Sequence, residues 1–274
     1  MKFADLHLHT VFSDGTYTPQ QLISESARVS LSAVAITDHD TVDGIPPAIE
    51  MAEKKNVEIL AGIELTAEYE GIEIHILGYL IDYKARGLLE KLETLKKNRI
   101  ERIYKMVDRL KGMGLTLSPQ TIFDLSKEGT VGRLHVARAM VKERLVSSVP
   151  EAFQKYIGDK SPAYILGFRF SPAEAIELIK DAGGIPVLAH PYSLNNDEII
   201  LKFIDSGLMG LEVYYPEHSQ AMINFYLDLA KKHNLLVTGG SDCHGNAKPG
   251  VKMGSIKIPY DLVERLKESK DKLR

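Results

Sequence analysis

The chain has 274 residues, with 34 Lys and Arg against 37 Asp and Glu, so its formal net charge at pH 7 is −3. Hydrophobic residues make up 44% and charged residues 26%, which excludes collagen-like, coiled-coil and intrinsically disordered chains. The near-neutral balance argues against a broad polyanion-binding surface but leaves room for a local basic pocket.

The cysteine content and the N-terminal sequence bear on the compartment. A single cysteine, Cys243, cannot form an intramolecular disulfide, which indicates a reducing environment. The first residues lack the apolar core of a signal peptide, and no stretch approaches the ~20 apolar residues that span a bilayer. We therefore expect a soluble, cytoplasmic protein with no membrane partner and no obligatory protein partner.

Short apolar runs alternate with helical patterns in the first 80 residues and again after Gly183. Strands are predicted at Phe3–Leu8, Ala33–Thr37, Val57–Leu65, Ile72–Leu80, Ile185–Ala189, Leu208–Tyr214 and Leu235–Thr238. Helices are predicted at Thr18–Val29, Ile45–Lys55, Glu198–Asp205 and Gln220–His233. Such alternation is typical of βαβ units and a parallel sheet. About seven units predict an α/β barrel, in which functional groups gather at the C-terminal ends of the strands.

The segment from Lys84 to about Ser161 breaks this rhythm. A long helical pattern over Leu88–Lys111 is followed by shorter ones at Pro119–Ser126, Leu134–Glu143 and Pro150–Ile157. We interpret residues 84–161 as an inserted helical cap domain and residues 1–83 with 162–274 as the barrel domain. A basic run on the long helix is interpreted as a solvated face, with a strand-guiding role as the alternative; it comprises Lys96, Lys97, Arg99 and Arg102.

Histidines and acids recur at or near the predicted strand ends. His7 and His9 share one face of a strand because side chains alternate along it. The other candidates are Asp14, His39, Glu64, His75, His190, Asp242 and His244. Each has a simpler alternative: a core histidine at position 75, a turn residue at 14, and caps at 39 and 190. The coincidence of all nine at one end of one sheet favours a metal site.

These motifs resemble the polymerase-and-histidinol-phosphatase (PHP) family of metal-dependent phosphoesterases. The resemblance rests on residues 5–15, 37–41, 62–64, 189–191 and 240–244 and extends over essentially the whole chain. It implies a distorted seven-stranded (β/α) barrel that holds three divalent metal ions. In that scheme one ion is held by His7, His9, Glu64 and Asp242, a second by Glu64, His75 and His190, and a third by Asp14, His39 and His244.

The donor set has a chemical consequence. Imidazole and carboxylate ligands without thiolate suit Mn, Fe or Zn and do not select among them. Asp38 and Asp40 flank His39 on the opposite face, so we interpret them as residues that orient ligands. Cys243 lies between Asp242 and His244 but alternation points its sulfur away, and we interpret it as a packing residue.

The cap sequence from Gly132 to Arg138 resembles a bacterial PHP subgroup that removes phosphate from nucleotides. Its members act on 3′,5′-nucleoside bisphosphates or nucleoside monophosphates, or are 5′-3′ exoribonucleases on short RNA. The resemblance implies that Arg133 and His135 hold the substrate phosphate, with Lys160 in the same pocket. A helix N-terminus and an arginine fork suit an anion. The alternative for Arg133 is a surface ion pair with Glu128.

The resulting hypothesis is metal-assisted hydrolysis of a phosphoester. The attacking group would be a metal-bound hydroxide, with Arg133 and His135 neutralising charge on the phosphoryl oxygens. Protonation of the leaving group stays unassigned. Two alternatives are a histidinol-phosphate-type phosphatase and a non-catalytic metal-binding PHP module. His218, which follows Pro216 and Glu217, matches no motif and is expected to be exposed.

Overall fold

The computed structural model describes residues 1–126, 129–159, 161–166, 170–194 and 196–273. Its strands are β1 (Phe3–Asp5), β2 (Ala33–Ile36), β3 (Glu58–Tyr69), β4 (Ile72–Tyr79), β5 (Ile185–Leu188), β6 (Gly210–Tyr214), β7 (Leu236–Gly239) and β8 (Ile258–Pro259). They form one sheet in the order β7-β6-β5-β4-β3-β2-β1-β8. Neighbours pair in parallel except at β4, which is antiparallel to both β3 and β5, and at β8, which is antiparallel to β1.

The two sides of the sheet approach each other just beyond β1 and β7. The amide of Leu6 donates to the carbonyl oxygen of Gly239 over 3.2 Å, and Leu8 pairs in parallel with Cys243. Gly240 permits this approach because a Cβ there would lie 2.4 Å from the backbone nitrogen of His7. The sheet is therefore nearly closed. The predicted α/β barrel with a cap is confirmed, with an eighth strand, the two-residue β8.

The connection between β3 and β4 differs from the prediction of βαβ units and a parallel sheet. Only Glu70 and Gly71 separate the strands, with φ values of +52° and +80°, and Tyr69 pairs with Ile72. Two positive φ values are the signature of a tight hairpin turn, which joins antiparallel strands. The prediction is wrong here because a helix-length crossover is missing, and a two-residue loop cannot return a parallel strand.

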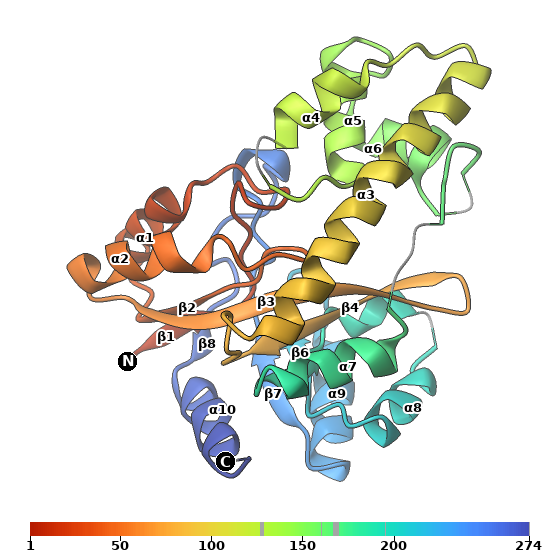
Figure 1. Ribbon diagram of the computed structural model, residues 1–274. Helices are drawn as coiled ribbons and strands as arrows, with labels where there is room; N and C mark the ends of the chain where they lie inside the picture. Colours follow the sequence, from red (N-terminus) through yellow and green to blue (C-terminus); the bar gives the residue numbers. More distant parts are fainter. Residues whose placement is uncertain (127–128, 160, 167–169, 195, 274) are drawn as a thin grey trace.

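Helices cover the outside of the barrel, as Figure 1 shows. They are α1 (Pro19–Arg28), α2 (Ile45–Lys55), α7 (Pro172–Asp181), α8 (Ile199–Asp205), α9 (Gln220–Lys232) and α10 (Asp261–Asp271). The start of α1 is fixed by a capping box in which Thr18 and Gln21 bond each other's backbone amides. The sequence patterns did not predict α7, α10 or β8. One apolar cluster fills the barrel interior around Leu60, Leu77 and Tyr79, and a larger one lies between sheet and helices.

The segment between β4 and α7 forms a helical layer over one end of the barrel. It contains α3 (Arg86–Gly112), α4 (Pro119–Ser126), α5 (Arg133–Lys142) and α6 (Val149–Ala152), followed by a π-helical turn at Phe153–Ile157. In Figure 1, α3 runs from the barrel to the other three helices at the top. These helices share their own buried apolar cluster, which includes Ile103, Met106 and Met140. The division into two domains at residues 84 and 161 stays a prediction.

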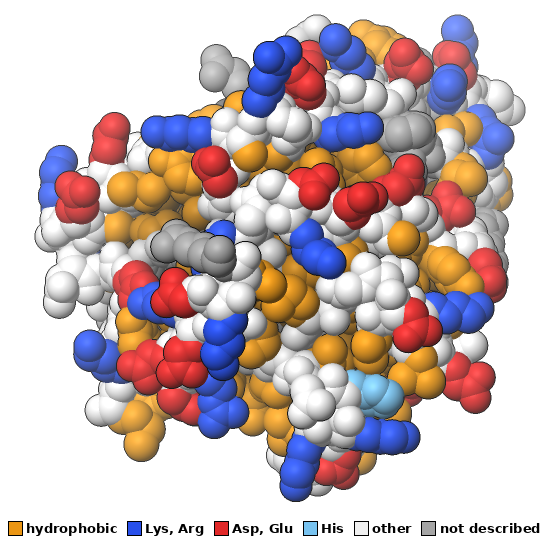
Figure 2. All heavy atoms as spheres, turned by 60° about the horizontal axis from the view of Figure 1, so that its bottom comes forward, with side chains coloured by type: hydrophobic (Ala, Val, Ile, Leu, Met, Phe, Trp, Pro, Cys, Tyr) orange, Lys and Arg blue, Asp and Glu red, His pale blue; other side chains and the backbone are white. Residues whose placement is uncertain are grey.

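The outer face that is turned forward in Figure 2 mixes Lys and Arg with Asp and Glu and exposes little histidine. The histidine-rich region is therefore not on this face. Within the described ranges, none of the helices is both long and apolar enough to cross a membrane.

Candidate metal centre

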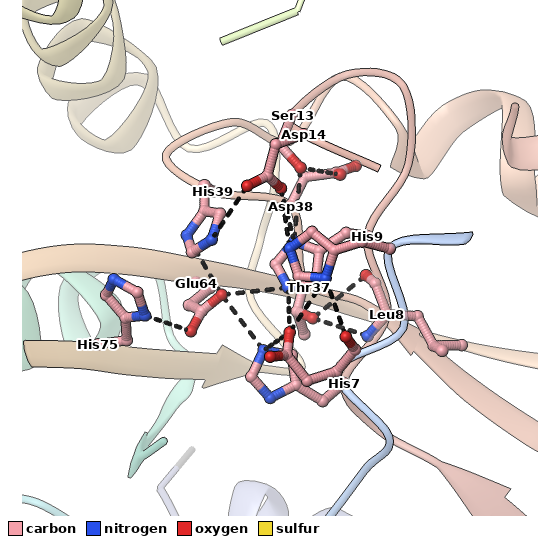
Figure 3. Close-up of polar contacts among 12 residues, drawn as sticks. His7, Leu8, His9, Ser13, Asp14, Thr37, Asp38, His39, Glu64 and His75 are labelled. Atoms are coloured by element: carbon pink, nitrogen blue, oxygen red, sulfur yellow. Dashed lines mark hydrogen bonds and ion pairs between the residues drawn. The ribbon is translucent and has the colours of Figure 1, made fainter. Parts of the chain in front are cut away.

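The nine predicted residues lie together at the end of the barrel where its parallel strands end. His7 and His9 follow β1, His39 follows β2, His190 follows β5, and Asp242 with His244 follows β7. His75 reaches the same end from near the start of β4 because that strand is antiparallel, and it pairs with Thr66 of β3. Figure 3 shows six of the nine side chains pointing toward one another.

Glu64 stands at the middle of this group and is 1% exposed. Its Oε2 lies 3.2 Å from His7 Nε2, from His9 Nε2 and from His39 Nδ1. Its Oε1 lies 2.9 Å from His75 Nδ1 and 3.3 Å from His190 Nε2. One carboxylate thus faces five imidazoles, as a ligand shared between ions would.

Asp242 faces two of the same imidazoles, and Asp14 faces the sixth, His244. Asp242 Oδ1 is 3.1 Å from His9 Nε2 and 3.5 Å from His7 Nε2, while Asp14 Oδ1 is 3.0 Å from His244 Nε2. Three groups have ligand atoms within 4.8 Å of one another: His7, His9 and Asp242; His39, Glu64 and His75; and His9, Asp14, His39 and His244. These groups resemble the predicted sets, although His9 and His39 each join two of them and the predicted ligand His190 joins none. The assignment of ligands to individual ions stays a prediction.

Buried atoms of these side chains lack hydrogen-bond partners. Among the described residues, such atoms include His7 Nε2, His9 Nε2, His39 Nδ1, His244 Nε2, Asp14 Oδ1 and Glu64 Oε2. A buried polar atom without a partner costs about 1–3 kcal/mol, so six in one place need an explanation. Imidazole nitrogens and carboxylate oxygens that face one another are the donor atoms of divalent transition metals. The residues present therefore fit a centre that holds more than one ion.

In the metal-free cluster the carboxylates raise the pKa values of three imidazoles, so these rings tend to hold protons at the places that metal ions would occupy. Burial alone would lower the pKa of each imidazole, yet Glu212, Glu64 and Asp242 hold the pKa of His7 well above its usual value. The carboxylates of Asp242 and Glu64 likewise outweigh burial and raise the pKa of His9 to about 9. Glu64 and Glu73 outweigh burial at His75 and raise its pKa to about 10.

The other ligands are ready to bind without losing a proton. Burial would raise the pKa of Glu64, Asp14 and Asp242, but neighbouring imidazoles, and Lys248 beside Asp242, hold all three well below their usual values. Burial lowers the pKa of His39 and of His244 despite the carboxylates beside them. Among the ligands with shifted pKa values, a metal ion must therefore displace protons mainly from His7, His9 and His75.

Asp38 and Asp40 hold the loops that carry the ligands. Asp38 accepts hydrogen bonds from the amide and hydroxyl of Thr10 over 2.7 and 2.6 Å, and from Ser13 Oγ over 2.6 Å. Ser13 Oγ in turn lies 3.4 Å from His9 Nδ1. Asp40 accepts from the amide of Thr66 over 2.8 Å and from Arg99 Nε over 2.7 Å. Neither carboxylate belongs to the three groups found among the described residues, and the orienting role stays a prediction.

Sequence reasoning missed Glu212 of β6. Its side chain is 0% exposed and accepts from His7 Nδ1 over 2.9 Å and from the His190 amide over 2.8 Å. The available signal was a single carboxylate inside the apolar run of residues 210–214, the same signal that singled out Glu64.

Arg99 and Arg102 correct the interpretation of the basic run on α3. Both line the cavity beside the metal centre, whereas Lys97 is exposed. Arg99 connects cap and barrel through Asp40, which accepts from its Nε over 2.7 Å, and it donates to the carbonyl of Val131 within the cap over 3.2 Å. Arg99 lies four residues after Leu95 and four before Ile103, on the stripe of α3 that is buried.

A cavity of about 260 Å³ opens from the ligands toward the cap. Arg133 lies on its wall, with its guanidinium 3.0 Å from Glu73 and 2.7 Å from Asp159. His135, on the first turn of α5, is not among the described residues that line this cavity; it is 1% exposed and accepts from the amide of Gly132 at Nδ1 over 3.1 Å. Lys160, and Glu128 as the alternative partner of Arg133, lie outside the described residues.

His218 was predicted to be exposed, but the structure buries it. It is 7% exposed, bonds the carbonyl of Val213 through Nδ1 over 2.8 Å, and packs against Tyr215 and Tyr226. The polar residues before it gave no sign that the loop folds back over this aromatic cluster. Cys243 is buried among apolar residues away from the ligands, as predicted.

Three comparisons show which known proteins this chain is similar to. The PHP domain model matches residues 5–120. The 3′,5′-nucleoside bisphosphate phosphatase of Chromobacterium violaceum is 30% identical over 91% of this chain and 90% of its own length. The 5′-3′ exoribonuclease Rnm of Escherichia coli is 31% identical over 88% of this chain and 84% of its own length. A crystal structure from Bifidobacterium adolescentis, described provisionally as a metal-dependent phosphoesterase, aligns with a TM-score of 0.89 and 34% identity over 96% of this chain and 94% of that one.

Proposed function

This chain belongs to the PHP family of metal-dependent phosphoesterases, and from that premise we propose that it hydrolyses phosphate esters of nucleotides at a centre of three divalent metal ions. The proposed substrates are 3′,5′-nucleoside bisphosphates or nucleoside monophosphates. Cleavage of short RNA from its 5′ end is a second candidate, favoured by the similarity to an exoribonuclease.

One observation carries the metal centre: six buried nitrogen and oxygen atoms without hydrogen-bond partners, Glu64 Oε2 among them, lie in one cluster. Between Glu64 and the imidazoles around it, nitrogen and oxygen lone pairs converge, and such lone pairs repel unless a cation or a proton lies among them. We assign the ligands as His7, His9, Asp14, His39, Glu64, His75, His190, Asp242 and His244. Divalent ions bound there would supply Lewis-acid activation of water and of the phosphoester, and Mn, Fe and Zn all suit these donors.

Arg133 is the proposed anchor for a substrate phosphate. Its guanidinium is largely buried on the cavity wall and already binds two carboxylates, Glu73 and Asp159. A phosphate is a stronger bidentate acceptor than a carboxylate and can replace one of them. Gly132 and Leu134, at the N-terminus of α5, line the same cavity, and a helix N-terminus favours an anion there.

His135 is proposed to donate a hydrogen bond to the substrate rather than to supply a proton. Burial lowers its pKa to about 4, so the ring is neutral at neutral pH. Because Nδ1 accepts from the amide of Gly132, the ring hydrogen lies on Nε2. A neutral Nε2–H can stabilise a phosphoryl oxygen, but a group with this pKa is a poor general acid at pH 7.

The cavity size bears on which part of the substrate is enclosed. At about 260 Å³ it is smaller than the ~300–1,000 Å³ of pockets that enclose a drug-sized ligand. We expect a phosphate and its sugar to enter, with the remainder of the nucleotide or RNA outside. A terminal nucleotide of a short oligomer would then be accommodated as readily as a free one.

Asp14→Ala tests the function, with the exposed Asp108→Ala of α3 as a matched control. Purified proteins loaded with Mn²⁺ are assayed for phosphate release from adenosine 3′,5′-bisphosphate, AMP and histidinol phosphate, and for mononucleotides from a 5′-phosphorylated oligoribonucleotide. We expect Asp14→Ala to lose turnover and Asp108→Ala to keep it. Full turnover by Asp14→Ala would refute the proposal. Metal binding by the wild type without hydrolysis of any substrate would instead support a non-catalytic module.

A further inference from the structure

Glu212 bonds two segments that carry proposed metal ligands, the one with His7 and the one with His190. It lies within β6 with no exposed surface, and its two carboxylate oxygens accept from two different residues. Oε1 accepts from His7 Nδ1 over 2.9 Å, and Oε2 accepts from the amide of His190 over 2.8 Å. We propose that Glu212 is a positioning residue that sets the tautomer of His7 and the backbone of His190 for metal binding.

The contact with His7 decides which ring nitrogen can bind a metal. An ionised carboxylate can only accept, so the hydrogen of this contact lies on Nδ1. The lone pair of neutral His7 is then on Nε2, which faces Glu64 Oε2 at 3.2 Å and Asp242 Oδ1 at 3.5 Å. Carboxylates that bond the far nitrogen of a histidine commonly orient metal ligands in this way.

The contact with His190 holds an unusual backbone. His190 has a φ of +27°, a conformation that residues other than glycine rarely adopt. Its amide would be left without a partner in the interior if Glu212 did not accept from it. In this conformation the ring places Nε2 at 3.3 Å from Glu64 Oε1. Glu212 therefore stabilises a strained turn whose result is a correctly placed imidazole.

Glutamine has the same shape as glutamate but cannot make both contacts. If its oxygen accepts from His7 Nδ1, its NH₂ group meets the amide of His190, which is also a donor. If its oxygen accepts from the His190 amide, its NH₂ group faces Nδ1 of His7, which must then accept. The ring hydrogen moves to Nε2 in that case and blocks the nitrogen that faces Glu64. Either orientation impairs one of the two histidines.

The test compares metal binding by wild type, Glu212→Gln and a control, Glu217→Gln, which changes an exposed carboxylate five residues away. Metal-free proteins are titrated with Zn²⁺ against a competing chelator, and long-range ¹H–¹⁵N spectra of the Zn²⁺-loaded proteins report histidine tautomers. We expect Glu212→Gln to bind Zn²⁺ about 10–100-fold more weakly, as when other orienting residues are lost. We also expect kcat to fall with KM unchanged, and excess metal to restore part of kcat. Glu217→Gln should match wild type throughout.

Unchanged Zn²⁺ affinity and unchanged histidine tautomers in folded Glu212→Gln would overturn the inference. If circular dichroism shows that this variant does not fold, Glu212→Asp replaces it, because it keeps both acceptors but is shorter by about 1.5 Å. At least tenfold weaker binding is expected there, and wild-type affinity would overturn the inference. The inference rests on the proposed metal centre: wild-type protein that binds no metal overturns both, whereas an unaffected Glu212 variant beside a metal-binding wild type overturns this one alone.

Discussion

Metal binding should be strongly pH-dependent because the metal-free centre holds protons in place of cations. Burial disfavours these charges, but the surrounding carboxylates hold the pKa of His7 well above 6.5, that of His9 at about 9 and that of His75 at about 10. These raised pKa values favour the protonated form of all three imidazoles at pH 7 in the metal-free protein. Each must lose its proton before its nitrogen can coordinate an ion.

The magnitude follows from the number of protons. If three protons leave when the centre fills, the overall constant for loading rises about 10³-fold for each pH unit near pH 7. The slope should flatten above pH 9 as His9, and then His75, lose their protons without metal. Protein without metal should show the opposite trend: raised pKa values add stability below about pH 6.5, and this stability is lost as the pH rises through 9 to 10.

Calorimetric titration of Mn²⁺ into metal-free protein measures this directly. Titrations in two buffers of different ionisation enthalpy count the protons released, and repeats from pH 6.5 to 9.5 give the slope. Release of about three protons at pH 7, declining toward pH 9.5, is the expected result. An affinity that does not change with pH, with no protons released, would refute the electrostatic reasoning.

Two further substitutions separate structural from substrate contacts. Arg99→Ala should lower the free energy of unfolding by about 3–5 kcal/mol because buried Asp40 loses its ionic partner. Arg86→Ala, which breaks an exposed pair with Glu90, should cost less than about 1 kcal/mol, and equal costs in urea unfolding would contradict this. Arg133→Ala should raise KM roughly 10–100-fold through loss of a charge-assisted hydrogen bond of about 1.5–3 kcal/mol, with only partial recovery in Arg133→Lys. An unchanged KM in steady-state assays would exclude Arg133 as the phosphate anchor.

The sequence was most informative where the chemistry is local. Alternation along an extended segment placed His7 and His9 on one side, and the structure brings both rings to Glu64. The prediction that the ligands after the parallel strands lie together rested on one rule, that such strands end at the same edge of a barrel. The helix predicted over Ile45–Lys55 has those bounds because its two prolines begin it and an apolar face continues it.

What the sequence did not reveal depends on contacts between distant segments. The role of Glu212 depends on its contact with His7, which lies 205 residues away in the sequence. A single acidic residue in an apolar strand belongs to no motif that would have identified it. Arg99 was assigned to solvent by its charge, although its helical position between Leu95 and Ile103 marked it as inward-facing. His75 reached the right edge for a reason not anticipated, the reversal of chain direction at the hairpin before β4.

Anomalous X-ray scattering from crystals of the metal-loaded protein tests the central claim most directly. The account predicts metal peaks between Glu64 and the surrounding imidazoles, with His7 bound through Nε2 and Asp14 sharing an ion with His244. Peaks confined to other parts of the surface, or an ordered cluster of these nine side chains with no metal under saturating Mn²⁺, would contradict it.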